Sequence, residues 1–377
     1  MHSWNFPSDQ PDNGQLCVTC NDVNHFDRHD SISELRTTAV NCQLCALLLE
    51  AIQRVNKHDL DNFNIRKNRS ALYMGNAGPR ILRLCSDIGI CYLFAYVRIT
   101  VTDYRFLATG AASDDIQVGF PVLPEATHSM RFDLLRAWLR RCDKEHACNG
   151  RGPGLKKVLP TRLLFVGNLN TDILSICNTT ELGDKDYVAL SHCWGNLSEE
   201  EKRKICTTGE NFRSRQKGFS INDLPRTFQD AIRVTRELGQ QYLWIDSLCI
   251  LQDDDKKDWK YEAKRMEDVF SSAYCVIAAH PATSSEESSA PSPHKGFLQR
   301  GISSRYVQIT DASGRRIYFC ADMDDFENDV NKSPLNTRGW VLQERALSRR
   351  TVHFTTNHMY WECGEGVCCE NLNRLKR

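Results

Sequence analysis

The middle of the chain contains three short apolar runs, Tyr187-Val-Ala-Leu-Ser191, Tyr242-Leu-Trp-Ile-Asp246 and Tyr274-Cys-Val-Ile-Ala-Ala279. Each run is continuously apolar and does not alternate, which is typical of strands that are covered on both faces. Segments 224–238 and 258–271 separate the runs, and both have the period of a helix. This order of strand, helix, strand, helix and strand predicts an α/β fold with a parallel sheet flanked by helices.

The two helical segments carry start and stop signals. Pro225 stands near the first turn of the first segment, and Gly239 follows its last periodic residue. In the second segment Trp259, Met266 and Phe270 recur in helical register. We therefore expect Trp259 to be a core residue, and truncating a buried aromatic ring costs about 3–5 kcal/mol.

The remainder of the chain is divided by a Gly- and Pro-rich segment at 149–155, which is the candidate linker. The sequence predicts a cysteine-rich, smaller mixed region at 1–150, a lead-in at 151–186 and a second domain at 187–377. Further elements are expected as helices over 42–55, 130–143 and 335–350, and as strands over 80–84, 91–102, 305–309 and 316–319.

The bulk composition narrows the class of protein. Lys+Arg and Asp+Glu are equal at 48 each, so no global charge favours nucleic acid or an anionic membrane, and we expect neither as a partner. The sequence has no apolar run of membrane-spanning length and no signal-peptide pattern at its start. Seventeen cysteines in such a chain favour reduced thiols and metal binding in the cytoplasm.

Two CxxC pairs, Cys17-Val-Thr-Cys20 and Cys42-Gln-Leu-Cys45, have the pattern of a tetrahedral zinc site. We expect a structural Zn²⁺ there, because four thiolates leave no open coordination position for catalysis. His25 and His29 are substitute ligands if one cysteine is not used. Four unrelated buried thiols are the competing interpretation, and a redox CxxC is less favoured because no thioredoxin-like strand precedes either pair.

A second cluster, Cys142, His146 and Cys148, offers three ligands at short spacing. It could complete its own metal site with a distant residue or contribute to the first site. The competing interpretation is a histidine at a helix end beside two free thiols.

Three blocks in the second half share one resemblance. They are Tyr187-Val-Ala-Leu-Ser-His-Cys-Trp-Gly195, the stretch 224–273 that includes Tyr242-Leu-Trp-Ile-Asp-Ser-Leu-Cys-Ile-Leu-Gln-Asp253, and Arg338-Gly-Trp-Val-Leu-Gln-Glu-Arg-Ala-Leu-Ser-Arg349 trailed by Tyr360-Trp-Glu-Cys363. In order, spacing and content they resemble the fungal heterokaryon-incompatibility (HET) domain over residues 187–363. His192 departs from the pattern, which usually has Tyr. The chain also stops shortly after the last block, as expected of a short member or a truncated chain.

The resemblance implies a cytoplasmic module of self/non-self recognition whose triggering ends in programmed cell death. It implies self-association and an incompatibility partner protein. The family is also remotely similar to TIR domains, which have a flavodoxin-like parallel sheet and in several lineages hydrolyse NAD⁺. NAD⁺ or a related nucleotide is therefore the implied substrate, and a non-enzymatic scaffold that recruits a death effector is the alternative function.

The TIR comparison implies a catalytic residue. Trp340-Val-Leu-Gln-Glu344 has the Trp-to-Glu spacing of the TIR pattern without its cysteine. Four residues make one helical turn, so both side chains would share a face. The carboxylate of Glu344 would stabilise an oxocarbenium-like transition state as nicotinamide leaves. A salt bridge to Arg338 or Arg345 is the competing role.

Ligands of α/β sheets bind at the carboxyl ends of the strands. We expect the nucleotide to be bound by residues at these strand ends and in the third block, namely Ser191, Trp194, Gly195, Asp246, Arg338 and Trp340. Gly195 could instead serve a tight turn, and Asp246 could cap the following loop. We expect Glu344 to line a cleft with Ser191, Trp194 or Asp246. A thiol hydrolase built on Cys193 and His192 is disfavoured, since the sequence offers no third residue to orient them.

Overall fold

The structure is a computed structural model, and it describes the following residues: 16–21, 31–55, 81–85, 90–97, 129–146, 148, 158–195, 197–253, 255–280, 296–298, 306–310, 316–321, 326–337, 339–370 and 374–375. The chain forms two compact units. Unit 1 comprises 1–124, 303–324 and 371–373, and unit 2 comprises 125–302, 325–370 and 374–377. The boundaries predicted at 150 and 186 stay a prediction, and the linker candidate 149–155 lies outside the described residues.

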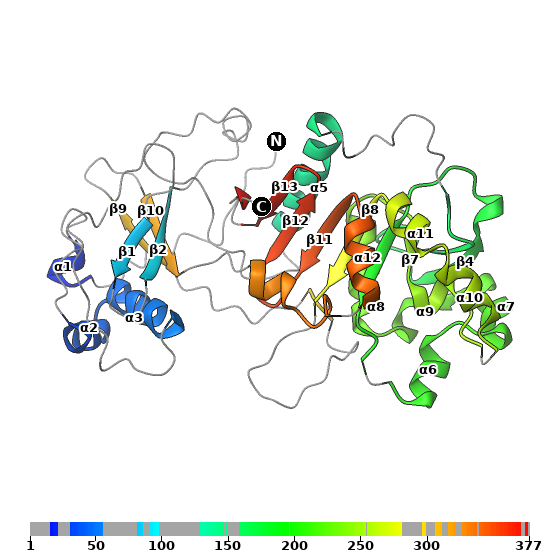
Figure 1. Ribbon diagram of the computed structural model, residues 1–377, viewed down its shortest axis with the longest axis horizontal. Helices are drawn as coiled ribbons and strands as arrows, with labels where there is room; N and C mark the ends of the chain where they lie inside the picture. The colour runs from blue at the N-terminus through cyan, green and yellow to red at the C-terminus, as the bar shows by residue number, and fades with distance from the viewer. Residues whose placement is uncertain are drawn as a thin grey trace. The chain divides into compact units, whose positions relative to one another are not determined.

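Unit 1 contains helices packed on a small antiparallel sheet (Figure 1). The sheet has the order β1-β2-β10-β9, and α3 contacts β2, β9 and β10. Ser31 caps α2 by accepting a hydrogen bond from the backbone N–H of Glu34. The elements are α1 (Val18–Asn21), α2 (Ile32–Ala39), α3 (Gln43–Val55), β1 (Ile81–Cys85), β2 (Ile90–Val97), β9 (Tyr306–Thr310) and β10 (Arg316–Ala321). The expected helix and strands are therefore present in this unit.

Unit 2 is built on a larger mixed sheet with the strand order β14-β13-β12-β11-β8-β5-β7-β3-β4-β6. Its strands are β3 (Arg162–Phe165), β4 (Ile173–Asn178), β5 (Val188–His192), β6 (Phe219–Ser220), β7 (Tyr242–Trp244), β8 (Cys275–Ala279), β11 (Arg350–Phe354), β12 (Met359–Cys363), β13 (Gly366–Cys369) and β14 (Arg374–Leu375). Its helices are α5 (Ser129–Glu145), η4 (Thr179–Glu181), α6 (Glu199–Ile205), α7 (Gly209–Lys217), η5 (Ile221–Asp223), α8 (Arg226–Glu237), α9 (Asp246–Cys249), α10 (Lys257–Ala263), α11 (Met266–Ser272), η6 (Glu327–Asn331) and α12 (Gly339–Leu347).

The centre of this sheet is parallel, as the three apolar runs predict. β5 pairs in parallel with β7 and β8, and β8 pairs in parallel with β11. In chain order the strands β7, β5, β8 and β11 have the arrangement 2-1-3-4, which is the order of flavodoxin-like sheets. The edges differ from the prediction, because β3, β4, β12 and β13 pair antiparallel.

Helices cover both faces of the parallel strands. Ala189 and Trp244 are register partners on one face, where Trp244 packs edge-to-face on Phe270 of α11. His192 points to the opposite face and packs in the same way on Phe228 of α8, with ring centroids 5.1 Å apart. The helix α8 ends at Glu237, and Gly239 just beyond it has a φ of 75°, which only glycine adopts readily.

The helix predicted over 258–271 is interrupted. Arg265 leaves helical geometry between α10 and α11, and its guanidinium donates to the carbonyl of Leu159 and to the hydroxyl of Thr161. As a consequence, the expected burial of Trp259 is wrong. Its ring is 41% exposed, because α10 ends one turn later and does not continue into the core.

The helix α5 lies along the C-terminal strands of unit 2. Arg131 and Glu370 form a fully buried ion pair, with Nε and Oε2 3.4 Å apart. Further along the helix the rings of Trp138 and Trp361 have centroids 6.3 Å apart. These contacts join an N-terminal helix to strands more than two hundred residues later in the chain.

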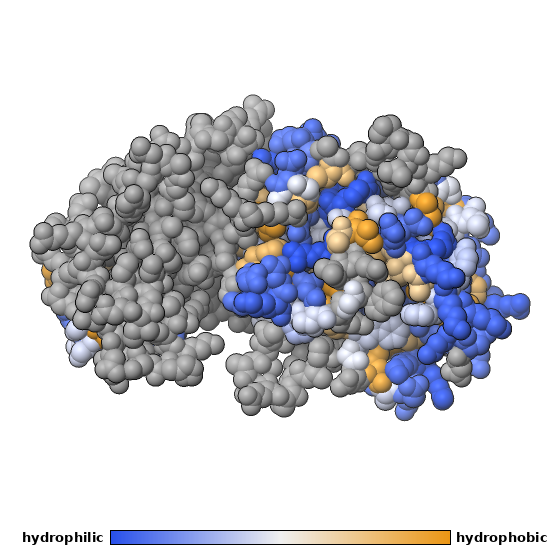
Figure 2. Space-filling view, viewed as in Figure 1, coloured by the Kyte–Doolittle hydropathy of each residue, from blue (hydrophilic) through white to orange (hydrophobic). Residues whose placement is uncertain are grey.

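Figure 2 shows hydrophilic side chains over much of the described surface of the visible face, with hydrophobic residues in separate patches. Of the described helices, none combines the length and the apolar character that a membrane span requires.

Candidate functional site

A cavity of about 220 Å³ opens at the carboxyl ends of β5 and β7. Residues that follow these strands form one wall, and residues of α10, α11 and α12 form the others. The lining residues are Leu190, His192, Trp194, Trp244, Asp246, Ile250, Gln252, Trp259, Ala263, Met266, Phe270 and Glu344. The lining of the cavity therefore combines three tryptophan rings with two carboxylates.

Trp194 and Asp246 connect the two strand ends. The indole Nε1–H of Trp194 donates to Oδ2 of Asp246 over 2.7 Å. Oδ1 of the same carboxylate accepts from the backbone N–H of Ser247, also over 2.7 Å, at the start of α9. Asp246 thus lines the cavity as the first residue of α9, whose N-cap is Ile245. Gly195, with φ 71°, permits the tight turn after Trp194.

Glu344 lines this cavity from α12, together with Trp194 and Asp246. The helix is held on the sheet by Val341, which packs with Ala278 of β8 and Leu335. The nearest arginine in sequence, Arg345, is directed to a different carboxylate: it forms two hydrogen bonds, of 2.8 and 3.1 Å, with Glu362.

The other expected binding residues have different positions. Arg338 and the side chain of Trp340 lie outside the described residues, although the backbone of Trp340 is part of α12. Ser191 does not line the cavity and is only 3% exposed. Its hydroxyl and that of Ser247 are buried and lack a hydrogen-bond partner within the described part of the chain. Each stands next in sequence to a cavity residue.

Cys193 packs against the apolar cluster of Ala278, Leu335 and Val341. Since His192 packs on α8 across the sheet, the two residues belong to different faces. This arrangement gives Cys193 a packing role.

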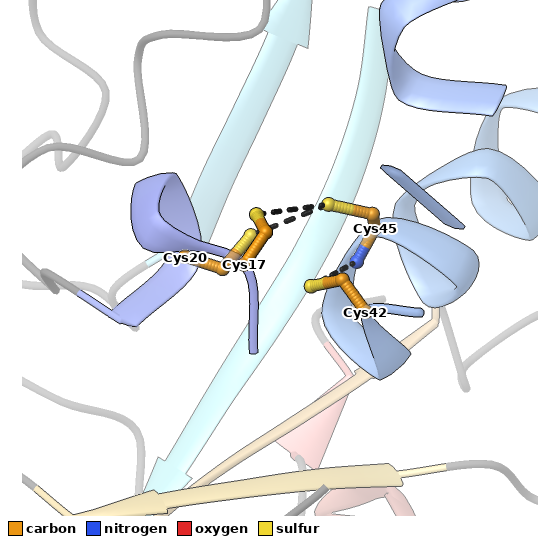
Figure 3. A group of neighbouring side chains, drawn as sticks. All are labelled: Cys17, Cys20, Cys42 and Cys45. Atoms are coloured by element: carbon orange, nitrogen blue, oxygen red, sulfur yellow. Dashed lines mark hydrogen bonds between the residues drawn. The ribbon is translucent and has the colours of Figure 1, made fainter. Parts of the chain in front are cut away.

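The two CxxC pairs of unit 1 meet, as the pattern predicts (Figure 3). The four sulfur atoms of Cys17, Cys20, Cys42 and Cys45 all lie within 4.8 Å of one another. The Cys17 and Cys45 sulfurs are 3.7 Å apart, and the Cys20 and Cys45 sulfurs 3.4 Å. Tetrahedral zinc with bonds of about 2.3 Å needs sulfurs about 3.8 Å apart, so the donor set fits zinc. His25 and His29, the substitute ligands, lie outside the described residues.

Cys142, His146 and Cys148 also come together, and Cys363 at the end of β12 joins them. The ligand atoms of these four residues lie within 4.8 Å of one another, with Nδ1 of His146 3.5 Å from the Cys363 sulfur. The hydrogen bond with Cys142 lowers the pKa of Cys363 to about 4. The sequence leaves the fourth ligand open, because Cys363 lies 217 positions from His146.

A buried chain of polar groups was not foreseen from the sequence. Ser333 Oγ lies 2.8 Å from Nδ1 of His280, whose Nε2 lies 3.0 Å from Nδ1 of His353. Nε2 of His353 then lies 3.0 Å from Oε2 of Glu362, which Arg345 holds from the other side. Burial, followed by the neighbouring charges, lowers the pKa of His280 well below its usual value. Burial of the Glu362 carboxylate raises its pKa, but hydrogen bonds from His353 and Arg345 outweigh this effect. The pKa of Glu362 is therefore strongly lowered.

Comparison with known proteins identifies the second half of the chain. Residues 187–344 match the family described as heterokaryon incompatibility protein (HET). This segment is similar to HET domains. A curated relative, heterokaryon incompatibility protein 6, OR allele, of Neurospora crassa, is 29% identical over 94 residues. That similarity covers 24% of this chain and 14% of the relative's length. No solved structure matches the chain significantly.

The HET match begins at the start of β5 and ends at Glu344. It therefore contains both strand ends and the helix that line the cavity. The C-terminal strands β11–β14 and the helix α5 lie outside the match.

Proposed function

We propose that this chain is a non-self recognition module whose HET domain triggers cell death by cleaving the nicotinamide–ribose bond of NAD⁺. The observation that supports the proposal is the common position of Glu344, Trp194 and Asp246 on one cavity at the carboxyl ends of parallel strands. Ligands of open α/β sheets bind at this edge. The name of the Neurospora relative supports the proposed role in recognition, and the geometry of the cavity supports the proposed hydrolysis.

The size of the cavity limits what it can enclose. Ligand pockets usually span about 300–1,000 Å³, and this cavity measures about 220 Å³. It has room for the nicotinamide riboside part of the dinucleotide, while the adenosine part would lie outside. Trp194, Trp244 and Trp259 provide flat apolar surfaces for a planar ring at the cavity wall.

Two kinds of polar group would serve the ribose. The carboxylates of Glu344 and Asp246 accept hydrogen bonds from ribose hydroxyls. The buried hydroxyls of Ser191 and Ser247 stand next to cavity residues, and buried polar groups normally have partners. A bound ligand or an ordered water would satisfy them.

In the proposed reaction the bond between nicotinamide nitrogen and ribose C1′ breaks, and the bonding electrons leave with neutral nicotinamide. Positive charge develops on the ribose, and the negative carboxylate of Glu344 stabilises it electrostatically. Water then adds to C1′ and releases a proton, giving ADP-ribose. Gln at position 344 keeps the shape of the side chain and removes the charge.

For unit 1 we propose one structural Zn²⁺ held by Cys17, Cys20, Cys42 and Cys45. The sulfur spacing given above supports it. Such an ion would link α1 to α3 and contribute free energy to the folding of unit 1.

The test measures nicotinamide release from NAD⁺ by purified, concentrated protein and by Glu344→Gln. The control is Glu267→Gln, on an exposed residue of α11 outside the cavity. We expect a loss of at least about 100-fold in the 344 variant, with an unchanged melting curve and full activity in the control.

Toxicity on overexpression in a fungal host separates the enzyme from the scaffold. We expect Glu344→Gln to abolish killing while the protein still accumulates. A folded Glu344→Gln variant that kills as wild type does would refute the enzymatic proposal and favour a self-associating scaffold that recruits a death effector.

A further inference from the structure

Three cysteines and one histidine meet in unit 2 between two elements far apart in sequence. Cys142, His146 and Cys148 lie at the C-terminal end of α5 and just beyond it, and Cys363 is the last residue of β12. His146 and Cys363 are separated by 217 positions in the chain. We propose that these four residues bind a second structural Zn²⁺, which staples α5 to the C-terminal strands of the unit.

The geometry agrees with a tetrahedral ion. Zn–S bonds of about 2.3 Å and Zn–N bonds of about 2.1 Å place sulfur and nitrogen about 3.6 Å apart. The Cys363 sulfur and Nδ1 of His146 are 3.5 Å apart, and the four ligand atoms all lie within 4.8 Å of one another. Three thiolates and one imidazole are a common donor set of structural zinc, and they leave no open position for catalysis.

The backbone at the site accommodates the crowding. Gly364 follows Cys363 directly, and a Cβ atom at this position would approach the Cys148 sulfur to 3.2 Å. Glycine thus leaves room for the sulfur to approach the strand end.

The site completes a row of contacts along α5. The Arg131–Glu370 ion pair stands near the start of the helix, and the Trp138–Trp361 pair follows. The four ligands stand at the far end of the helix. Arg350, whose guanidinium pairs with Asp143, supplies a positive charge near the cysteines and so offsets the net negative charge of a Zn²⁺ with three thiolates. The ion would therefore add a link to β12 at the end of α5 that Asp143 already joins to Arg350 of β11.

The first experiment counts zinc per chain in protein purified from zinc-supplemented cells. We expect two ions in wild type, one in Cys363→Ser and two in the control Cys177→Ser, which changes a partly exposed cysteine outside both clusters. Zinc X-ray absorption on Cys42→Ser, in which only the second site remains, should give three sulfur neighbours and one nitrogen. A Cys363→Ser protein with as much zinc as wild type would overturn the proposal.

The second experiment works on wild type and decides the matter if Cys363→Ser does not fold. Cys148 and Cys177 are both partly exposed, so without a metal iodoacetamide would label them at similar rates. We expect Cys148 to be labelled at least about tenfold more slowly than Cys177 until a zinc chelator is added. Equal labelling of the two cysteines before the chelator is added would overturn the proposal.

Discussion

Acidification should destabilise unit 2 through two buried histidines. His280 is 5% exposed and His353 is 1% exposed, and their rings are hydrogen-bonded to each other. Burial is the largest cause that lowers the pKa of both residues, and the pKa of His280 is lowered further than that of His353. One arrangement of protons satisfies the whole chain: Ser333 donates to His280, His280 to His353, and His353 to Glu362. In this arrangement both rings are neutral, and a further proton on Nδ1 of His353 would require His280 to change its tautomer.

The sign and size follow from linkage. A histidine whose folded pKa lies below its unfolded value of about 6.5 contributes stability that is fully present above that pH and is lost as the pH falls. At pH 5.5 each histidine that stays neutral in the folded protein lowers the free energy of unfolding by about 1.4 kcal/mol, because the same histidine takes up a proton in the unfolded chain. With one or both rings neutral, unit 2 should lose about 1.4–2.8 kcal/mol between pH 7.5 and pH 5.5.

Urea unfolding followed by tryptophan fluorescence measures this loss in the right unit, because every tryptophan except Trp4 lies in unit 2. The variants His280→Asn and His353→Gln remove one titrating ring each and keep a hydrogen-bonding side chain. Each should reduce the acid-induced loss by up to about 1.4 kcal/mol relative to wild type. Other acid-sensitive groups, including the cysteine clusters, act equally in wild type and variants and cancel in the comparison.

If both variants lost as much stability over this pH interval as wild type, the two histidines would not be the source of the acid sensitivity. Histidine NMR signals from positions 280 and 353 that titrate near pH 6.5 would refute the prediction independently.

Two further predictions concern side chains around the cavity. Arg345→Met should cost about 2–3 kcal/mol in urea unfolding at pH 7.5, because it leaves the charge of Glu362 without its partner. This is less than the roughly 3–5 kcal/mol expected of a fully buried pair, since the side chain of Arg345 is 23% exposed. Glu362→Leu in the same background should recover part of the loss, and no recovery would contradict the pairing. Trp259→Ala should lower the free energy of unfolding by at most about 1 kcal/mol, since the residue is 41% exposed. The same variant should bind the nucleotide more weakly in isothermal titration. A loss of about 3 kcal/mol or more in the free energy of unfolding would instead show that Trp259 is a core residue.

The centre of the fold could be predicted from sequence because its signals are local. The runs beginning at Tyr187, Tyr242 and Tyr274 are continuously apolar, and parallel strands buried on both faces require such runs. The antiparallel edges carry weaker signals. β3 has four residues and β6 has two, and their pairing depends on contacts that are distant in sequence. The expected burial of Trp259 is wrong because helical period does not reveal where a helix is interrupted.

The site was predictable only in part, for the same reason. The meeting of Cys17, Cys20, Cys42 and Cys45 could be predicted from their spacing alone. By contrast, Cys363 is 217 positions from His146, and His353 is 73 from His280, so neither partnership leaves a local pattern. Such residues can be recognised as a group only after the sheet has brought β8, β11 and β12 together.

The helix α12 gives two neighbouring residues opposite tasks. Consecutive helical residues point about 100° apart, so Glu344 can line the cavity while Arg345 reaches Glu362 on β12. Arg345 thereby fixes the rotation of α12, and Glu362 stands beside Cys363, the proposed zinc ligand. A change at Arg345 would therefore alter both stability and the position of the Glu344 carboxylate. Glu344→Gln changes only the charge, which is why it separates chemistry from folding where Arg345→Met cannot.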